Sequence, residues 1–217
     1  TRVRSSAASD VYKRQMEKVL KDAFAKHEDV TLVGIEQYST RAQDYSPAVL
    51  KLKAAEPDIV MQVGYFRDGV ILAKTYQQLD FHPVVLGTGG ASGDPKLKDE
   101  IGDLVDGQIA VTPFSDDRPV VQPVLQALKA KFNQPLTLNS ALAYQGVMVL
   151  RAVLENAGST DHDAIAKAFG EIKLTAGEVI TASDFIQFDE MGRNKGRNTV
   201  LTQFQDGKPV TVWPASK

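Results

Sequence analysis

The sequence has no cysteine and only three histidines, and these absences exclude several kinds of chemistry. Without cysteine there are no disulfides, no thiolate metal sites and no cysteine nucleophile. The histidines, His27, His82 and His162, are far apart and show no metal-ligand spacing. The sequence therefore predicts neither a metal site nor a cofactor, and it favours binding over catalysis.

Long apolar runs and an excess of positive charge are also lacking. No apolar run approaches the roughly 20 residues that a membrane-spanning helix needs. The formal net charge is -2, so no general basic surface is available for nucleic acid. The chain has 217 residues, of which 43% are hydrophobic and 24% charged, as expected for one or two globular domains.

The first fifteen residues differ from the rest. Ser5–Gln15, SSAASDVYKRQ, matches the translation of a common transposon-based sequencing adapter. We expect residues 1–15 to be non-native, the alternative being a natural disordered arm. The remaining 202 residues carry 21 basic and 26 acidic side chains, a net charge of -5. On this interpretation the gene is truncated upstream, and the missing signal peptide says nothing about location.

From Met16 onwards the pattern alternates between helical and strand periodicity. Helices are predicted at Met16–His27, Ser46–Ala55, Asp68–Leu79 and Pro95–Ile101. Strands are predicted at Val30–Tyr38, Asp58–Val63, Pro83–Leu86 and Gln108–Thr112. The alternation predicts right-handed βαβ units and a parallel sheet. The near-continuous apolar strands IVMQV and PVVL predict that both faces of this sheet are covered.

After Pro113 the character changes, and a domain crossing is expected near residues 112–117. Helices are predicted at Arg118–Asn133, Ser140–Asn156 and Asp161–Phe169. Short strands are predicted at Phe185–Phe188, Thr199–Gln205 and Pro209–Trp213. The dipeptide Asp206–Gly207 indicates a tight hairpin between the last two strands.

Gly87–Gly93, GTGGASG, follows a predicted strand and precedes a helix. It fails both the P-loop and the dinucleotide-binding glycine patterns. A flexible ligand-contacting loop at the carboxyl end of a parallel strand is favoured, because open α/β sheets bind ligands there; a plain connecting turn is the alternative. Ser92 lacks the second glycine of a nucleophile elbow, and no histidine is placed to act as its base.

Gly64–Asp68, GYFRD, lies at the same predicted edge, between a buried strand and a helix. Tyr65 could form an apolar ligand wall, or Phe66 could pack the helix onto the sheet and leave Tyr65 merely exposed. Asp44–Pro47, DYSP, precedes another helix, and helix capping explains it.

Several motifs in one order resemble the leucine/isoleucine/valine-type periplasmic binding proteins. They are Asp44–Tyr45, KLKAAEPDIV (51–60), GYFRDGV (64–70), VVLGTGG (84–90), LVDG (104–107), ALAYQGVMVLRAVLENAGSTD (141–161), FDEMGR (188–193) and QDGKPVTVWP (205–214). The resemblance covers nearly all of residues 16–217.

The resemblance implies an α/β fold of the type I periplasmic-binding-protein class, with two Rossmann-like lobes and parallel sheets. Residues 16–112 would form the second lobe and residues 113–195 the C-terminal part of the first, which would be incomplete. Residues 196–217 would return to the second lobe. Removing half of one lobe exposes sheet edge and apolar surface, so we expect poor solubility for 16–217.

The resemblance also implies a ligand site but no catalytic residue. Its implied members are Gly64, Tyr65, Phe66, Asp68, Thr88, Gly89, Gly90 and Asn139. Gly89 stands where leucine-type members have an acidic residue that faces the ligand's amino group. Asp68 or Asp94 could substitute, or the ligand could be an amide, a urea-like compound or an aromatic acid.

The implied function is capture of a branched-chain amino acid or an analogue by the extracytoplasmic component of an ABC transporter. The implied partners are that small ligand and a membrane permease, with the complete protein a periplasmic monomer. One alternative is the ligand-sensing domain of an amide- or amino-acid-responsive regulator or receptor. Another is an α/β enzyme that binds a phosphate ligand at Gly87–Gly93.

Overall fold

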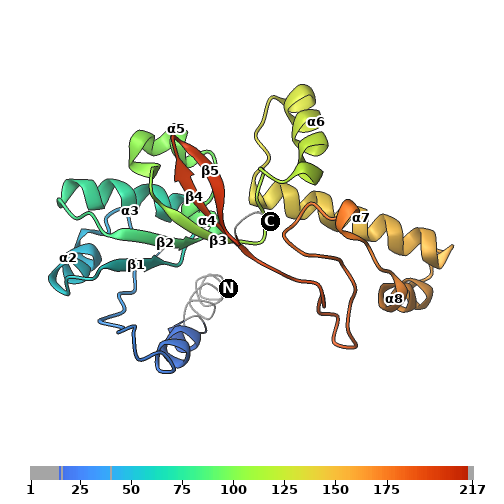
Figure 1. The fold of residues 1–217 in the computed structure, drawn as a ribbon, viewed down its shortest axis with the longest axis horizontal. Coiled ribbons are helices and arrows are strands. Elements are labelled where there is room, and N and C mark those ends of the chain that lie inside the picture. Colours follow the sequence, from blue (N-terminus) through green and yellow to red (C-terminus); the bar gives the residue numbers. More distant parts are fainter. Residues whose placement is uncertain (1–14, 16, 40, 215–217) are drawn as a thin grey trace.

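The computed structural model describes residues 15, 17–39 and 41–214, and it shows two parts joined by extended segments (Figure 1). One part contains a sheet with helices, and the other is mainly helical. The predicted adapter segment falls almost wholly on residues 1–14, which lie outside the described ones.

A five-stranded mixed sheet forms the first part, in the order β1-β2-β3-β4-β5. The strands are β1 (Ile59–Gln62), β2 (Val84–Thr88), β3 (Ile109–Thr112), β4 (Val200–Gln205) and β5 (Lys208–Trp213). The first three are parallel, as predicted, whereas β4 and β5 are antiparallel to their neighbours. The hairpin predicted at Asp206–Gly207 joins β4 to β5, and both residues adopt positive φ angles of 52° and 74°.

Four helices accompany the parallel strands, namely α2 (Ser46–Ala54), α3 (Phe66–Gln78), α4 (Gly89–Ser92) and α5 (Leu97–Ile101). Along β1 and β2 alternate residues are buried, and Val60 and Val85 from this buried face pack with Leu72 and Tyr76 of α3. The other face is partly open: Ile59 is 56% exposed. The prediction of a sheet covered on both faces is therefore wrong for the described residues.

The segment before α2 agrees with the prediction in one part only. Residues 17–24 are helical, as predicted, but no residue from 30 to 39 is in a strand. Val30 and Val33 are 44% and 55% exposed. The predicted strand Val30–Tyr38 is thus wrong: these residues pair with no strand among the described residues, although Tyr38 at the end of the segment packs on the core.

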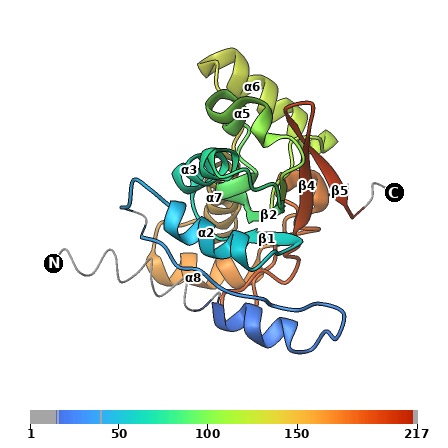
Figure 2. The ribbon, with the colours of Figure 1, turned by 90° about the vertical axis from the view of Figure 1, so that its left-hand side faces the viewer.

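The second part contains α6 (Gln122–Phe132), α7 (Leu138–Ala157) and α8 (His162–Glu171), close to their predicted positions. Figure 2 shows the molecule from the side of the sheet, with α7 behind it. The predicted strand Phe185–Phe188 is wrong, because Ile186 and Phe188 form only isolated bridges with Leu174 and Asn194.

Each part has its own hydrophobic core. The two clusters of the first part draw on residues 38–105 together with Phe204, which returns on β4. The two clusters of the second part draw only on residues 114–188. No described cluster mixes the two sets, so each part buries its apolar surface independently.

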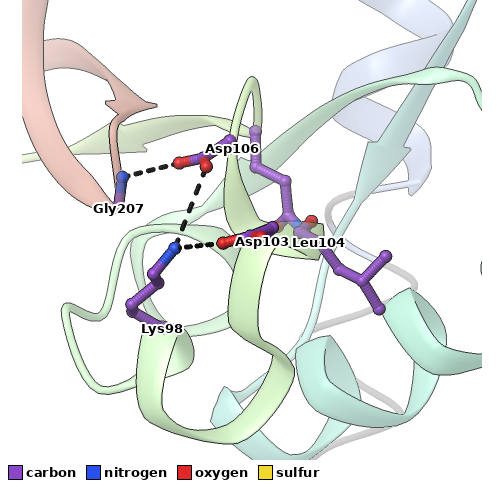
Figure 3. Close-up of polar contacts among 6 residues, drawn as sticks. Lys98, Asp103, Leu104, Asp106 and Gly207 are labelled. Carbon is purple, nitrogen blue, oxygen red and sulfur yellow. Dashed lines mark hydrogen bonds and ion pairs between the residues drawn. The ribbon is translucent and has the colours of Figure 1, made fainter.

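Polar contacts fix the returning hairpin to the sheet part (Figure 3). The Asp106 carboxylate accepts a hydrogen bond from the backbone N–H of Gly207 at 2.7 Å and lies 3.9 Å from the Lys98 ammonium. Lys98 also pairs with Asp103 at 2.7 Å. These contacts join the turn between β4 and β5 to the chain that precedes β3.

Candidate functional site

The carboxyl ends of β1 and β2 bring four of the predicted site residues together. The Thr88 hydroxyl, at the end of β2, donates a hydrogen bond to the Gly64 carbonyl oxygen at 3.4 Å. A Cβ added at Gly90 would lie 3.7 Å from that oxygen and 3.8 Å from Cα of Tyr65. Gly64, Tyr65, Thr88 and Gly90 therefore line one continuous edge, where parallel sheets present ligand sites.

The two adjacent aromatic residues at this edge have different environments. Tyr65 precedes the first residue of α3 and is 57% exposed. Phe66 is half-buried and packs against the apolar cluster formed by Ala73, Leu97, Ile101, Val105 and Phe204. Phe66 thus anchors α3, and Tyr65 is the aromatic side chain left to contact a ligand.

Asp68 lies behind this edge rather than on it. Its side chain is only 2% exposed, and both oxygens accept hydrogen bonds, one from the Tyr45 hydroxyl at 2.8 Å and one from the Tyr65 backbone N–H at 2.9 Å. Burial, and then the hydrogen bond with Asp68, raise the pKa of the Tyr45 phenol to about 12. Asp68 closes the capping box of α3, and its burial keeps the carboxylate away from a ligand ammonium at this edge.

The glycine-rich segment is more regular than predicted. Gly87 and Thr88 belong to β2, and Gly89–Ser92 form the single turn α4, so the expected flexible loop is wrong. Gly87 is needed because a Cβ there would collide with the Ser92 hydroxyl. Ser92 is fully buried, and among the described residues its hydroxyl has no hydrogen-bond partner, which agrees with its rejection as a nucleophile.

Asp94 and Asn139 lie apart from the four residues at the edge. Asp94 accepts the backbone N–H of Lys96 at 2.9 Å, so it serves the turn before α5. Asn139 is exposed in the first turn of α7, in the second part. Leu136, just before α7, meets Gly93 and Thr202 around a crevice of about 10 Å³, so α7 begins beside the sheet. No described contact joins Asn139 to the edge.

A larger hollow, of about 310 Å³, lies in the second part. It is lined by apolar residues of α7 and by polar residues of the returning chain, among them Leu142, Val149, Thr181, Ser183 and Arg197. None of the predicted site residues lines it. Among the described residues, no group of histidine, aspartate or glutamate side chains could hold a metal ion, and no helix is long and apolar enough to cross a membrane.

Tyr45 is the residue that the sequence analysis missed. Its motif was interpreted as helix capping, but the N-cap residue of α2 is Tyr45 and it makes no side-chain cap hydrogen bond. The Asp44 carboxylate, one residue earlier, accepts the Ser46 backbone N–H at 2.8 Å. Tyr45 itself is 1% exposed and reaches a carboxylate 23 residues away. A tyrosine between two polar residues gives no signal of such a contact.

The parallel strands of the sheet thus end at a glycine-lined edge that carries an exposed aromatic residue. The sequence matches the periplasmic binding protein family over residues 2–208, and the chain belongs to this family. The match extends into residues 5–15, so the origin of that segment stays a prediction.

Two similar proteins have leucine in their names. The Leu/Ile/Val-binding protein homolog 7 of Brucella suis biovar 1 (strain 1330) is 27% identical over 201 residues, which are 89% of this chain and 50% of the relative. A leucine-binding protein from Thermotoga maritima MSB8 is 25% identical with a TM-score of 0.68, covering 80% of this chain and 49% of that one. These relatives are binding proteins and not enzymes, as predicted.

A structure with a different ligand shares the fold. The solute-binding protein of an ABC transporter from R. palustris, solved with benzoate, has a TM-score of 0.69 at 14% identity, over 81% of this chain and 48% of that one. The chain spans about half the length of the curated relatives it matches.

Proposed function

We propose that this chain is part of the extracytoplasmic substrate-binding component of a branched-chain amino-acid-type ABC transporter. It captures a small amino acid or related ligand and delivers it to a membrane permease. The observation that carries the proposal is the edge formed by Gly64, Tyr65, Thr88 and Gly90 in a chain of the periplasmic binding protein family.

The proposal includes two lobes. Residues 16–112 and 196–217 form one lobe, and residues 113–195 belong to the other. The separate hydrophobic clusters and the return of β4 and β5 to the sheet support this division. A ligand held between the lobes contacts Tyr65, Thr88, Gly89 and Gly90 on one side and Asn139 on the other, and lobe closure buries it.

The charges at the edge bear on the ligand's chemistry. Gly89 brings no carboxylate, the Asp68 carboxylate is buried in the capping box of α3, and the Asp94 carboxylate accepts a backbone N–H in the turn before α5. This edge therefore offers an aromatic surface, a hydroxyl and backbone groups, but no free acid for an ammonium. A ligand whose positive charge is absent, or is paired by other residues, suits it better than a free amino acid bound by this edge alone.

Calorimetric titration tests the proposal on the product of the complete reading frame, with L-leucine, L-leucinamide and benzoate as separate probes. We expect one of them to bind, and Tyr65→Ala to weaken that binding about tenfold to a hundredfold, as for a buried aromatic contact. Tyr144→Ala is the matched control, because Tyr144 is also exposed but lies on α7. Binding that survives Tyr65→Ala unchanged would contradict this assignment of the site.

A further inference from the structure

Tyr45 and Asp68 form a buried polar network that binds the backbone of Tyr65. The Tyr45 hydroxyl donates to Oδ1 of Asp68 at 2.8 Å, and Oδ2 of Asp68 accepts the Tyr65 backbone N–H at 2.9 Å. Tyr45 and Asp68 are 1% and 2% exposed. Two hydrogen bonds in series therefore connect the hydrophobic core to the backbone of the residue that faces the proposed ligand space.

The same turn is also held from its other side. The Tyr38 hydroxyl donates to the Val63 carbonyl oxygen at 3.2 Å, and the Tyr38 ring lies against the Tyr45 ring with 4.4 Å between centroids. A Cβ at Gly64 would lie 2.8 Å from both the Tyr38 hydroxyl and Oδ2 of Asp68. The backbone from Val63 to Tyr65 is thus enclosed and has little freedom to shift.

Helix capping alone does not explain this arrangement. A capping carboxylate works at the protein surface, where water solvates its charge, and burying it costs free energy unless hydrogen bonds compensate. Here Asp68 is buried and Tyr45 supplies the compensating donor. Such a fully satisfied buried network fixes one geometry, which suits a group that must present a side chain at a constant position.

We propose that Tyr45 and Asp68 are positioning residues: they fix the turn at Gly64–Phe66 so that the Tyr65 ring projects into the ligand space. The role in ligand binding rests on the proposed function, whereas the hydrogen bonds that hold the turn do not depend on it. We therefore predict that removing one hydroxyl from the core loosens the Tyr65 backbone and weakens ligand binding without unfolding the protein.

The first measurement is amide hydrogen exchange in the 217-residue chain, followed by NMR. Tyr45→Phe removes the hydroxyl and keeps the ring, and we expect exchange at the Tyr65 amide to accelerate about fivefold to tenfold, as for one lost hydrogen bond. Exchange at Leu72, inside α3, should not change. Tyr76→Phe is the matched control, because Tyr76 belongs to the same core cluster and makes no described contact with Asp68.

A second pair of variants tests Asp68 itself. Asp68→Ala should release the Tyr65 amide, whereas Asp68→Asn keeps one oxygen for that amide and should restore most of its protection. If Asp68 had a purely structural role, the substitutions would change exchange at the Tyr65 amide, exchange at the Leu72 amide and the melting temperature in parallel. An unchanged Tyr65 amide in Tyr45→Phe, or equal acceleration in Tyr76→Phe, would overturn the inference.

Titration with L-leucine and with benzoate on the complete product connects the geometry to binding. Tyr45→Phe should weaken the probe that binds by about fivefold to tenfold, and Tyr76→Phe by less than twofold. If neither probe binds the unsubstituted protein, the ligand assignment fails, but amide exchange still decides the positioning role. Loosened exchange with unchanged affinity would refute the link between the turn and the ligand.

Discussion

Single residues at the carboxyl edge of the sheet are constrained by what lies behind them. Gly64 is enclosed by the Tyr38 hydroxyl and the Asp68 carboxylate. That carboxylate accepts two hydrogen bonds from the protein itself. The βα alternation predicted that one edge of the sheet would hold Gly64, Tyr65, Thr88 and Gly90, because parallel strands end at the same edge. It did not predict the burial of Asp68, because that burial depends on Tyr45, 23 residues away.

Gly64→Ala tests this crowding. The added Cβ would meet the Asp68 carboxylate and the Tyr38 hydroxyl at 2.8 Å, so we expect a loss of about 1–3 kcal/mol in the free energy of unfolding. Gly146→Ala is the control, because Gly146 lies within α7 with open space at its Cβ position and should gain about 0.5–1 kcal/mol. Urea denaturation measures both. A Gly64→Ala protein as stable as the parent would show that the edge can adjust.

Elements were predicted well where the chain itself carries the signal. The helices α2, α3, α7 and α8 lie close to their predicted positions, and the β4–β5 turn follows from Asp206–Gly207. The strands predicted at residues 30–38 and 185–188 fail because a strand needs a partner, and β propensity does not supply one. Alternate exposure along β1 shows similarly that an apolar strand can be covered on one face only.

The returning hairpin is an element whose attachment can be tested through Asp106. Asp106→Ala removes the acceptor of the Gly207 N–H and the longer ion pair with Lys98, so we expect a loss of about 1 kcal/mol in the free energy of unfolding. Asp99→Ala is a matched control, since Asp99 is an exposed acid on α5 with no described side-chain partner. Thermal denaturation distinguishes them. Equal effects of the two substitutions would mean that this contact does not hold the hairpin.

At the scale of the whole molecule, residues 113–117, where the chain first passes from one part to the other, are hydrogen-bonded to β5. The Asp117 carboxylate accepts hydrogen bonds from the Thr211 backbone N–H and from the Thr211 hydroxyl, each at 2.9 Å, and another from the Ser115 hydroxyl. Burial alone would raise the pKa of Asp117, but these hydrogen bonds outweigh it and hold that pKa below its usual range.

This pKa shift gives the crossing a defined pH dependence. Because the folded-state pKa of Asp117 is lowered, its stabilising contribution is complete above the unfolded pKa of about 3.9 and is lost as the pH falls through the folded value. We expect Asp117→Asn to be less stable than the parent at pH 7, with the difference shrinking below about pH 4. Urea denaturation across this range measures the difference. A gap that stays constant in acid would mean that the charge of Asp117 contributes nothing.

The helix α7 also has consequences for the whole molecule, because it is apolar on two sides. Val149 and Val153 are buried, whereas Leu142, Val147 and Leu150 are 44%, 65% and 45% exposed. A stripe along one side of the helix is formed by five exposed residues, Leu142, Ala143, Gly146, Val147 and Leu150. A second apolar side on a helix is normally covered by another surface, so we expect the 217-residue chain to self-associate through this stripe.

Substitution on α7 tests this expectation directly. Val147→Lys and Leu150→Lys place charges in the middle of the stripe, and they should shift the chain from associated species to the monomer in size-exclusion chromatography with light scattering. Met191→Lys is the matched control, because Met191 is 75% exposed in a loop outside the stripe and its replacement should leave the association unchanged. If the parent chain is monomeric at every concentration, or if Met191→Lys is equally effective, the stripe does not drive association. Self-association that responds to α7 alone would mean that this side of the helix requires a covering surface, as its pattern of apolar residues predicts.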